Sequence, residues 1–250
     1  MPGALALSSA LRAQLRQARR VCVLTGAGAS AESGIPTFRE AQSGLWARYD
    51  PLELATPEAF DRDPALVWTW YRWRRTLVQA AQPNAGHVAL AALANRVPEL
   101  TLITQNVDGL HQQAGSRDIV EFHGNLFVNR CADPACAQET AAICEAEVPR
   151  CPHCGDRLRP GVVWFGEAIP GHALQRAQSA TEHCDVFISV GTSASVWPAA
   201  GLIGAAADAG ATVIDINPHE TELSATCAHR LIAKSARALP ELVDCFARSA

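Results

Sequence analysis

Short apolar runs alternate with longer amphipathic stretches along most of the chain. Four of the runs are rich in β-branched residues and end at glycine or polar positions, which is typical of buried parallel strands. These four predicted strands are residues 21–25, 100–104, 185–190 and 212–217. Helical patterns precede and separate them at residues 8–19, 87–97 and 199–210. This alternation predicts an α/β fold built on a doubly wound, Rossmann-like parallel sheet.

Two close cysteine pairs interrupt this alternation. Cys131 and Cys136 are followed, after 14 residues, by Cys151 and Cys154. Cysteine pairs at such a spacing surround one tetrahedral Zn²⁺ ion, and four thiolates leave no open coordination position. The pattern therefore predicts a structural zinc rather than a catalytic one.

The cysteine-rich segment divides a single predicted domain, 1–250. Residues 18–126 and 162–246 are assigned to the Rossmann-like part, and residues 127–161 to a small inserted zinc-binding module. Reduced thiols in a loop are the alternative to a zinc site, and Cys144 and His153 are alternative ligands. Acidic residues outnumber basic ones in the insert, which argues against a zinc ribbon that binds nucleic acid.

Composition narrows the class of protein further. Of the 250 residues, 48% are hydrophobic and 18% are charged, with a net charge of −4, so a nucleic-acid partner is not expected. No apolar run is long enough for a membrane span, and the N-terminus has no signal-peptide pattern. Nine cysteines then indicate metal binding or buried thiols. A cytoplasmic protein with no membrane partner is predicted.

A glycine loop, GAGASA at residues 26–31, follows the first predicted strand. It fits the G-x-G-x-x-A pattern, in which glycines let the backbone approach a pyrophosphate. A tight glycine turn explains the loop equally well when it is taken alone. An ordinary dehydrogenase also needs an acidic residue at the end of a second strand, about 20 residues on. Residues 34–46 have no strand pattern, so the ribose must be bound differently.

The stretch WTWYRWRR, residues 68–75, combines aromatic and basic side chains. Helical phasing predicts three faces. They are a core stripe of Leu66, Trp70, Trp73 and Leu77; an adjacent stripe of Val67, Tyr71, Arg74 and Val78; and a solvent-facing side of Trp68, Arg72 and Arg75. Arg74 thus lies among apolar neighbours, and an arginine that extends past valines to solvent is the alternative explanation.

Seven segments together resemble the sirtuin family of NAD-dependent protein deacylases, in the family's order and from about residue 18 to 246. They are GAGASAESGIPTFR (26–39), TQNVDGLH (104–111), FHGN (122–125), the two cysteine pairs, PGVVWFGE (160–167), GTSASVWPAA (191–200) and IDINP (214–218). The resemblance implies NAD as a co-substrate and one structural zinc.

The resemblance also implies roles for individual residues. The NAD-binding set would be Gly26, Ala27, Gly28, Ser30, Glu32, Thr37, Phe38, Arg39, Gln105, Asn106, Asp108, Gly191, Thr192, Ser193, Asn217 and Ala236. His123 and Asn106 would be catalytic, with His123 as the base that deprotonates a ribose hydroxyl. Products would be free lysine, nicotinamide and 2′-O-acyl-ADP-ribose. Val163, Phe165 and Gly166 would bind the substrate peptide as an added strand.

The same resemblance predicts which acyl groups are removed. Tyr71-x-x-Arg74 matches the branch that removes malonyl, succinyl and glutaryl groups, and so does Thr37 before Phe38. A guanidinium fork and a phenolic hydroxyl suit a terminal carboxylate. Removal of acetyl groups by the same enzyme stays open, and Glu40, where glycine is common, departs from the pattern.

The expected partners are acyl-lysine proteins and peptides, and the expected state is a monomer. Two other functions remain open. One is protein ADP-ribosyl transfer at the same NAD site, and the other is a non-catalytic NAD-sensing or zinc-ribbon binding module.

Overall fold

The computed structural model describes residues 7–36, 54–141, 146–222 and 224–247. Its centre is a six-stranded sheet of order β3-β2-β1-β7-β8-β9, in which every neighbouring pair is parallel. The strands are β1 (Arg20–Thr25), β2 (Glu99–Thr104), β3 (Val120–Glu121), β7 (Val186–Val190), β8 (Thr212–Ile216) and β9 (His229–Leu231). This is the predicted Rossmann-like arrangement.

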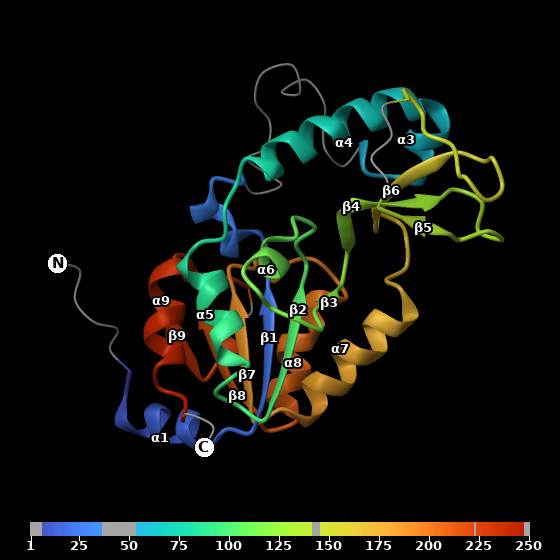
Figure 1. Ribbon diagram of the computed structural model, residues 1–250. Helices are drawn as coiled ribbons and strands as arrows, with labels where there is room; N and C mark the ends of the chain where they lie inside the picture. The colour runs from blue at the N-terminus through green and yellow to red at the C-terminus, as the bar shows by residue number, and fades with distance from the viewer. Residues whose placement is uncertain (1–6, 37–53, 142–145, 223, 248–250) are drawn as a thin grey trace.

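Helices cover both faces of the sheet (Figure 1). One face is covered by α1 (Ser9–Gln17), α5 (Ala85–Leu93) and α9 (Ser235–Val243), and the other by α7 (Gly171–His183) and α8 (Ala199–Asp208). Successive residues of β1 point to opposite faces, as the pleat requires. Val21 and Val23 pack under α1, α5 and α9, whereas Cys22 and Leu24 pack under α7 and α8.

The four predicted strands are confirmed, and so are the three predicted helices. Ser8 caps α1 through its side-chain oxygen, which accepts from the Leu11 N–H at 3.1 Å. The short edge strands β3 and β9 were not predicted, because two or three residues are too few to show a period. No helix in the described part of the chain is long and apolar enough to cross a membrane.

A second, smaller lobe lies beyond the carboxyl ends of the sheet (Figure 1). Its antiparallel sheet has the order β5-β4-β6 and contains β4 (Gly124–Cys131), β5 (Glu139–Thr140) and β6 (Leu158–Val162). The helices α3 (Pro57–Arg62) and α4 (Pro64–Gln79) share one apolar core with it, formed by residues such as Phe60, Trp68, Leu126, Leu158 and Trp164. The small lobe therefore takes in two helices that lie before residues 127–161.

Helix α4 carries the aromatic-basic stretch, and its phasing differs from the prediction in part. Trp68 and Arg75 were predicted to face solvent, but their exposed fractions are 1% and 8%. The indole of Trp68 donates to the Leu158 carbonyl at 2.9 Å, and the Arg75 Nε donates to the Leu126 carbonyl at 2.7 Å. Leu77, predicted in the core, is 40% exposed.

The burial of the other side chains of α4 is explained by the elements that pack around the helix. Trp70 and Tyr71 are buried as predicted, whereas Leu66, Trp73 and Arg72 are half-buried. Arg72 donates to the carbonyls of Ala146 and Glu147. The helix packs against β4, β6 and the loop before β6 at once, so more of its circumference is buried than a single amphipathic stripe assumes.

Candidate active site

The candidate site lies where β1, β2 and β7 end side by side. From β1 the chain continues to β2 and β3 on one side of the sheet. It then returns to add β7, β8 and β9 on the opposite side of β1, so the strand order reverses at β1. Crevices at such a switch point, outside the carboxyl ends of parallel strands, are where open α/β sheets bind ligands. Glycine loops leave β1 and β7 here, and the segment with Gln105, Asn106 and Asp108 leaves β2.

Two glycine loops pack backbone to backbone at this edge. The Gly28 N–H donates to the Gly191 carbonyl at 2.8 Å, and the Gly26 N–H donates to the Val190 carbonyl at 2.9 Å. A Cβ atom on Gly28 would lie 2.7 Å from the Gly191 Cα, and Gly191 itself has a φ of +58°. Only glycine fits this approach, and it leaves loop backbone open toward the crevice.

A buried hydroxyl, that of Ser30, links the loops after β1 and β2. Ser30 Oγ donates to Asp108 Oδ2 at 2.7 Å and accepts from Asn106 Nδ2 at 3.1 Å. Asn106 Nδ2 also donates to the Gly26 carbonyl at 3.0 Å, and Asp108 Oδ1 accepts from the Leu110 N–H at 2.9 Å. Three of the predicted NAD-binding side chains thus form one hydrogen-bonded cluster with fixed orientations.

His87 belongs to the same cluster, although the sequence analysis did not select it. It closes the capping box of α5, in which its Nδ1 accepts from the Asn84 N–H at 3.2 Å. The proton is therefore on Nε2, which lies 3.3 Å from Ser30 Oγ and donates to it. Burial lowers the pKa of His87, against the nearby charge of Asp108. The Asn84-x-x-His87 spacing was the signal that could have identified it.

His111 is a second buried histidine that the sequence analysis left without a role. Its Nε2 lies 3.0 Å from the Thr25 hydroxyl, and its ring centre lies 4.8 Å from that of His87. Burial, and then the neighbouring His87, lower its pKa to about 3. Both rings are therefore neutral near pH 7, and they add no positive charge behind the crevice.

His123 stands at the junction of the two lobes, between β3 and β4. Its Nδ1 lies 3.1 Å from the Gln105 carbonyl, and a carbonyl can only accept, so Nδ1 carries the proton. The tautomer leaves Nε2 with a free lone pair, as a general base requires. Burial lowers the pKa of His123, while the bond to Gln105 opposes the shift, so the neutral form prevails at pH 7.

The other predicted NAD-binding residues are connected in pairs. Gln105 Nε2 donates to the Thr192 hydroxyl at 3.0 Å, and Asn217 Nδ2 donates to the Thr192 carbonyl at 2.9 Å. The Ala236 N–H donates to Glu32 Oε2 at 2.8 Å, which joins the start of α9 to the glycine loop. Ser193 Oγ lies 2.7 Å from Ser195 Oγ.

Some predictions fall on residues that the structure does not describe. Thr37, Phe38 and Arg39 lie outside the described residues, as do Glu40 and Cys144.

Tyr71 and Arg74 lie together on α4, as the phasing predicted. The guanidinium carbon of Arg74 is 5.6 Å from the ring centre of Tyr71 and 5.0 Å from that of Trp70. Burial lowers the pKa of Arg74, while Tyr71 and Asp108 raise it, and burial raises the pKa of Tyr71 against the charge of Arg74.

The segment Val163–Glu167 connects β6 to α7 beside His123. The N–H groups of Val163 and Phe165 donate to the carbonyls of His123 and Ala55, both at 2.9 Å, and the Trp164 N–H donates to Glu167 Oε2 at 2.8 Å. The Glu167 N–H donates to the Trp164 carbonyl at 3.1 Å, so the chain turns at Phe165 and Gly166. The side chain of Phe165 is 42% exposed.

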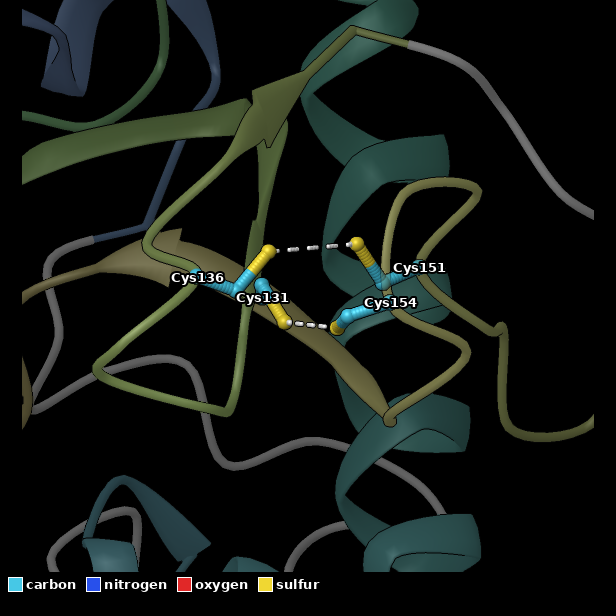
Figure 2. A group of neighbouring side chains, drawn as sticks. All are labelled: Cys131, Cys136, Cys151 and Cys154. Atoms are coloured by element: carbon cyan, nitrogen blue, oxygen red, sulfur yellow. Dashed lines mark hydrogen bonds between the residues drawn. The ribbon is translucent and has the colours of Figure 1, made fainter.

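Four sulfur atoms converge in the small lobe (Figure 2). Cys131 ends β4, Cys136 lies in the turn between β4 and β5, and Cys151 and Cys154 lie in the turn before β6; all four Sγ atoms are within 4.8 Å of one another. The Cys131–Cys154 and Cys136–Cys151 sulfur separations are 3.4 and 3.8 Å. Zn–S bonds of about 2.3 Å in a tetrahedron give edges of about 3.8 Å, so the four thiolates fit one zinc ion.

These features define a Rossmann-like nucleotide-binding protein with a Cys₄ metal module. The Sir2 family model matches residues 26–198, and the chain belongs to the Sir2 family.

Named relatives extend the likeness to the whole chain. The chain is 52% identical to NAD-dependent protein deacylase 1 of Pseudomonas aeruginosa, over 92% of this chain and 95% of that protein. It is 49% identical to the NAD-dependent protein deacylase of Methylococcus capsulatus, over 97% and 98%. A crystal structure of a Sir2 homolog–NAD complex superposes with a TM-score of 0.89 at 44% identity and covers 98% of this chain and 95% of that one.

Proposed function

We propose that this protein is an NAD-dependent protein-lysine deacylase. The observation that carries the proposal is His123, which lies at the junction of the two lobes with Nδ1–H bonded to the Gln105 carbonyl and Nε2 unprotonated. Two relatives that share about half of their residues with this chain are NAD-dependent protein deacylases by name, and a structural neighbour binds NAD; both support the proposal.

The two loops after β1 and β7 hold the phosphates and ribose of NAD in this proposal. Gly26 and Gly28, whose N–H groups bond to the Val190 and Gly191 carbonyls, let the loop backbone approach the phosphates at Ala27, and Thr192, Ser193 and Asn217 offer polar groups to the adenosine side. Gln105, Asn106 and Asp108 line the nicotinamide side. Glu32 and the Ala236 N–H already bond to each other, so they close the adenine end as a unit.

Bound NAD supplies an electrophilic ribose carbon, and nicotinamide is its leaving group. His123 takes the proton of a ribose hydroxyl at Nε2, while its Nδ1–H stays bonded to the Gln105 carbonyl. The Asn106 side chain keeps its place through the Gly26 carbonyl and Ser30. Carbonyl groups of Val163 to Gly166 hold the substrate peptide. The four cysteines hold zinc, which supports the lobe and takes no part in the reaction.

The acyl side of the site favours groups that end in a carboxylate, such as succinyl and malonyl. Tyr71 and Arg74 supply a hydroxyl and a guanidinium within a partly apolar wall. An acetyl group leaves the Arg74 charge without a substrate partner, which costs binding energy but still permits slower removal.

A panel of acetyl-, succinyl-, malonyl- and glutaryl-lysine peptides tests the proposal directly. Each peptide is incubated with NAD, and nicotinamide release and products are followed by mass spectrometry. The proposal predicts free lysine and an acyl-ADP-ribose in solution. ADP-ribose attached to protein would identify a transferase instead, and unchanged peptides after long incubation would identify a non-catalytic NAD-binding protein.

A further inference from the structure

The side chain of Trp164 has no task in the chemistry above, yet it contacts the acyl-binding pair. It is 2% exposed, and its indole Nε1 donates to the Tyr71 hydroxyl oxygen at 2.9 Å. The contact joins the segment after β6 to helix α4, across the core of the small lobe.

The hydrogen-bonding capacity of the neighbours decides what the Tyr71 hydroxyl can do. An indole N–H and a guanidinium can only donate; the Trp164 indole donates to the Tyr71 hydroxyl, and the guanidinium carbon of Arg74 lies 5.6 Å from the centre of the Tyr71 ring. A hydroxyl has two lone pairs and one hydrogen. Because the Trp164 indole N–H occupies one lone pair, the hydrogen of Tyr71 points away from Trp164 and must go to an acceptor.

We propose that Trp164 is a positioning residue for acyl selection, because its donation to Tyr71 directs the Tyr71 hydrogen toward an acceptor on the substrate. A terminal carboxylate accepts from Tyr71 and from Arg74 together, whereas the methyl group of acetyl-lysine accepts nothing. This role rests on the proposed preference for acidic acyl groups.

The surroundings of Trp164 hold its ring in one orientation. The guanidinium carbon of Arg159 lies 3.5 Å from the centre of the indole ring, and the Phe60 ring lies 5.4 Å away at 43°. Glu167 accepts from the Trp164 backbone at 2.8 Å and from Arg159 at 2.5 and 2.8 Å. Burial would raise the pKa of Glu167, but the bonds from Arg159 and Trp164 lower it, so it stays charged. The indole N–H therefore has a fixed direction.

Trp164→Phe removes the N–H and keeps an aromatic ring in the same place. The succinyl- and acetyl-lysine forms of one peptide are compared at saturating NAD. The ratio of their kcat/KM values is expected to fall about 3- to 10-fold, as for the loss of one neutral hydrogen bond, mainly through a higher KM for the succinyl peptide. Trp68→Phe is the matched control, since it removes another buried indole donor from the same core and should leave the ratio unchanged.

The Tyr71→Phe background separates positioning from general packing. There the ratio should not change further when Trp164→Phe is added, because the hydroxyl that Trp164 directs is already gone. An unchanged ratio in the single variant, or an equal fall in both backgrounds, would overturn the role of Trp164. If Trp164→Phe does not fold, 3-benzothienylalanine at position 164 keeps the ring shape without the N–H, and the same fall is expected.

Arg74→Met distinguishes this inference from the function on which it rests. If Arg74→Met lowers the succinyl-to-acetyl ratio and Trp164→Phe does not, only the role of Trp164 is wrong. If the unmodified enzyme does not act on succinyl-lysine, or Arg74→Met leaves the ratio unchanged, the acyl preference fails and the role of Trp164 fails with it.

Discussion

The two sides of the proposed active site, here called its walls, are built in different ways. The wall at the end of the large sheet consists of backbone and short polar groups, in which Gly28 and Gly191 touch and Ser30 is enclosed by partners. The wall on α4 and the segment after β6 consists of long side chains, Tyr71, Arg74 and Trp164. Backbone contacts leave little room for an added atom, whereas in the proposed function single side chains of the second wall would alter substrate choice without disturbing the sheet.

Removal of zinc is expected to have the largest effect, and it should act on the small lobe first. Cys131 and Cys151 belong to the same apolar core as Phe60, Trp68 and Trp164. Structural zinc contributes on the order of 10 kcal/mol in small metal domains, so a strong chelator should unfold this lobe. Limited proteolysis should then cut within residues 124–162, and activity should return with added zinc. Equal resistance to protease before and after chelation would contradict the account.

His123→Ala tests the base at the junction of the two walls. Loss of a positioned general base lowers kcat by about 10²–10⁴-fold. The rate of acyl-ADP-ribose formation measures the effect, and circular dichroism checks the fold. His183→Ala, at an exposed histidine of α7, is the control and should behave as the unmodified protein does. If the kcat of His123→Ala lies within threefold of that of the unmodified protein, His123 is not the base.

The buried histidine His111 makes the wall of the large sheet sensitive to acid. Its pKa falls from 6.5 to about 3 on folding, so between those values the unfolded chain binds a proton that the folded protein does not. Its contribution to stability is complete above pH 6.5 and is lost as pH falls toward 3, by about 1.4 kcal/mol per pH unit. The free energy of unfolding, measured in urea at several pH values, should depend less steeply on pH for His111→Gln than for the unmodified protein. Equal slopes would exclude this linkage.

Gly28→Ala should destabilise the contact between the two glycine loops, with a smaller effect than the three changes above. The new Cβ would meet the Gly191 Cα at 2.7 Å and its carbonyl oxygen at 2.8 Å, and overpacking of this kind costs about 1–3 kcal/mol. A lower Tm and a higher KM for NAD are expected. Gly204→Ala, in α8 with nothing within 4 Å of its Cβ, should keep or raise the Tm. The same Tm for both variants would show that the two loops adjust freely.

The large sheet and the small lobe also differ in how far the sequence predicts them. The central strands and the glycine loops follow from apolar runs and glycine positions, because parallel strands are buried on both faces. The cysteine spacing predicts the zinc cluster because tetrahedral coordination fixes the geometry. These features depend on local sequence alone.

The second wall depends on packing between distant segments. Trp68 and Arg75 are buried because β4 and β6 approach α4 from a side that its own sequence does not indicate. The contact of Trp164 with Tyr71 joins positions 93 residues apart, and no spacing rule predicts it. His111 was missed for the same reason, since its partner Thr25 lies at the end of β1, whereas His87 had a local signal in the Asn84-x-x-His87 spacing.

The most direct test is to measure kcat/KM of Arg74→Met for succinyl- and acetyl-lysine peptides. It asks whether the wall on α4 selects the acyl group while the wall of glycine loops binds NAD. Loss of a charged hydrogen bond should lower the succinyl value on the order of 100-fold and the acetyl value much less. The KM for NAD should change little, because Arg74 lies on α4 and the glycine loops follow β1 and β7. If the succinyl and acetyl values fall equally, α4 does not select the acyl group, and the account of the second wall is wrong.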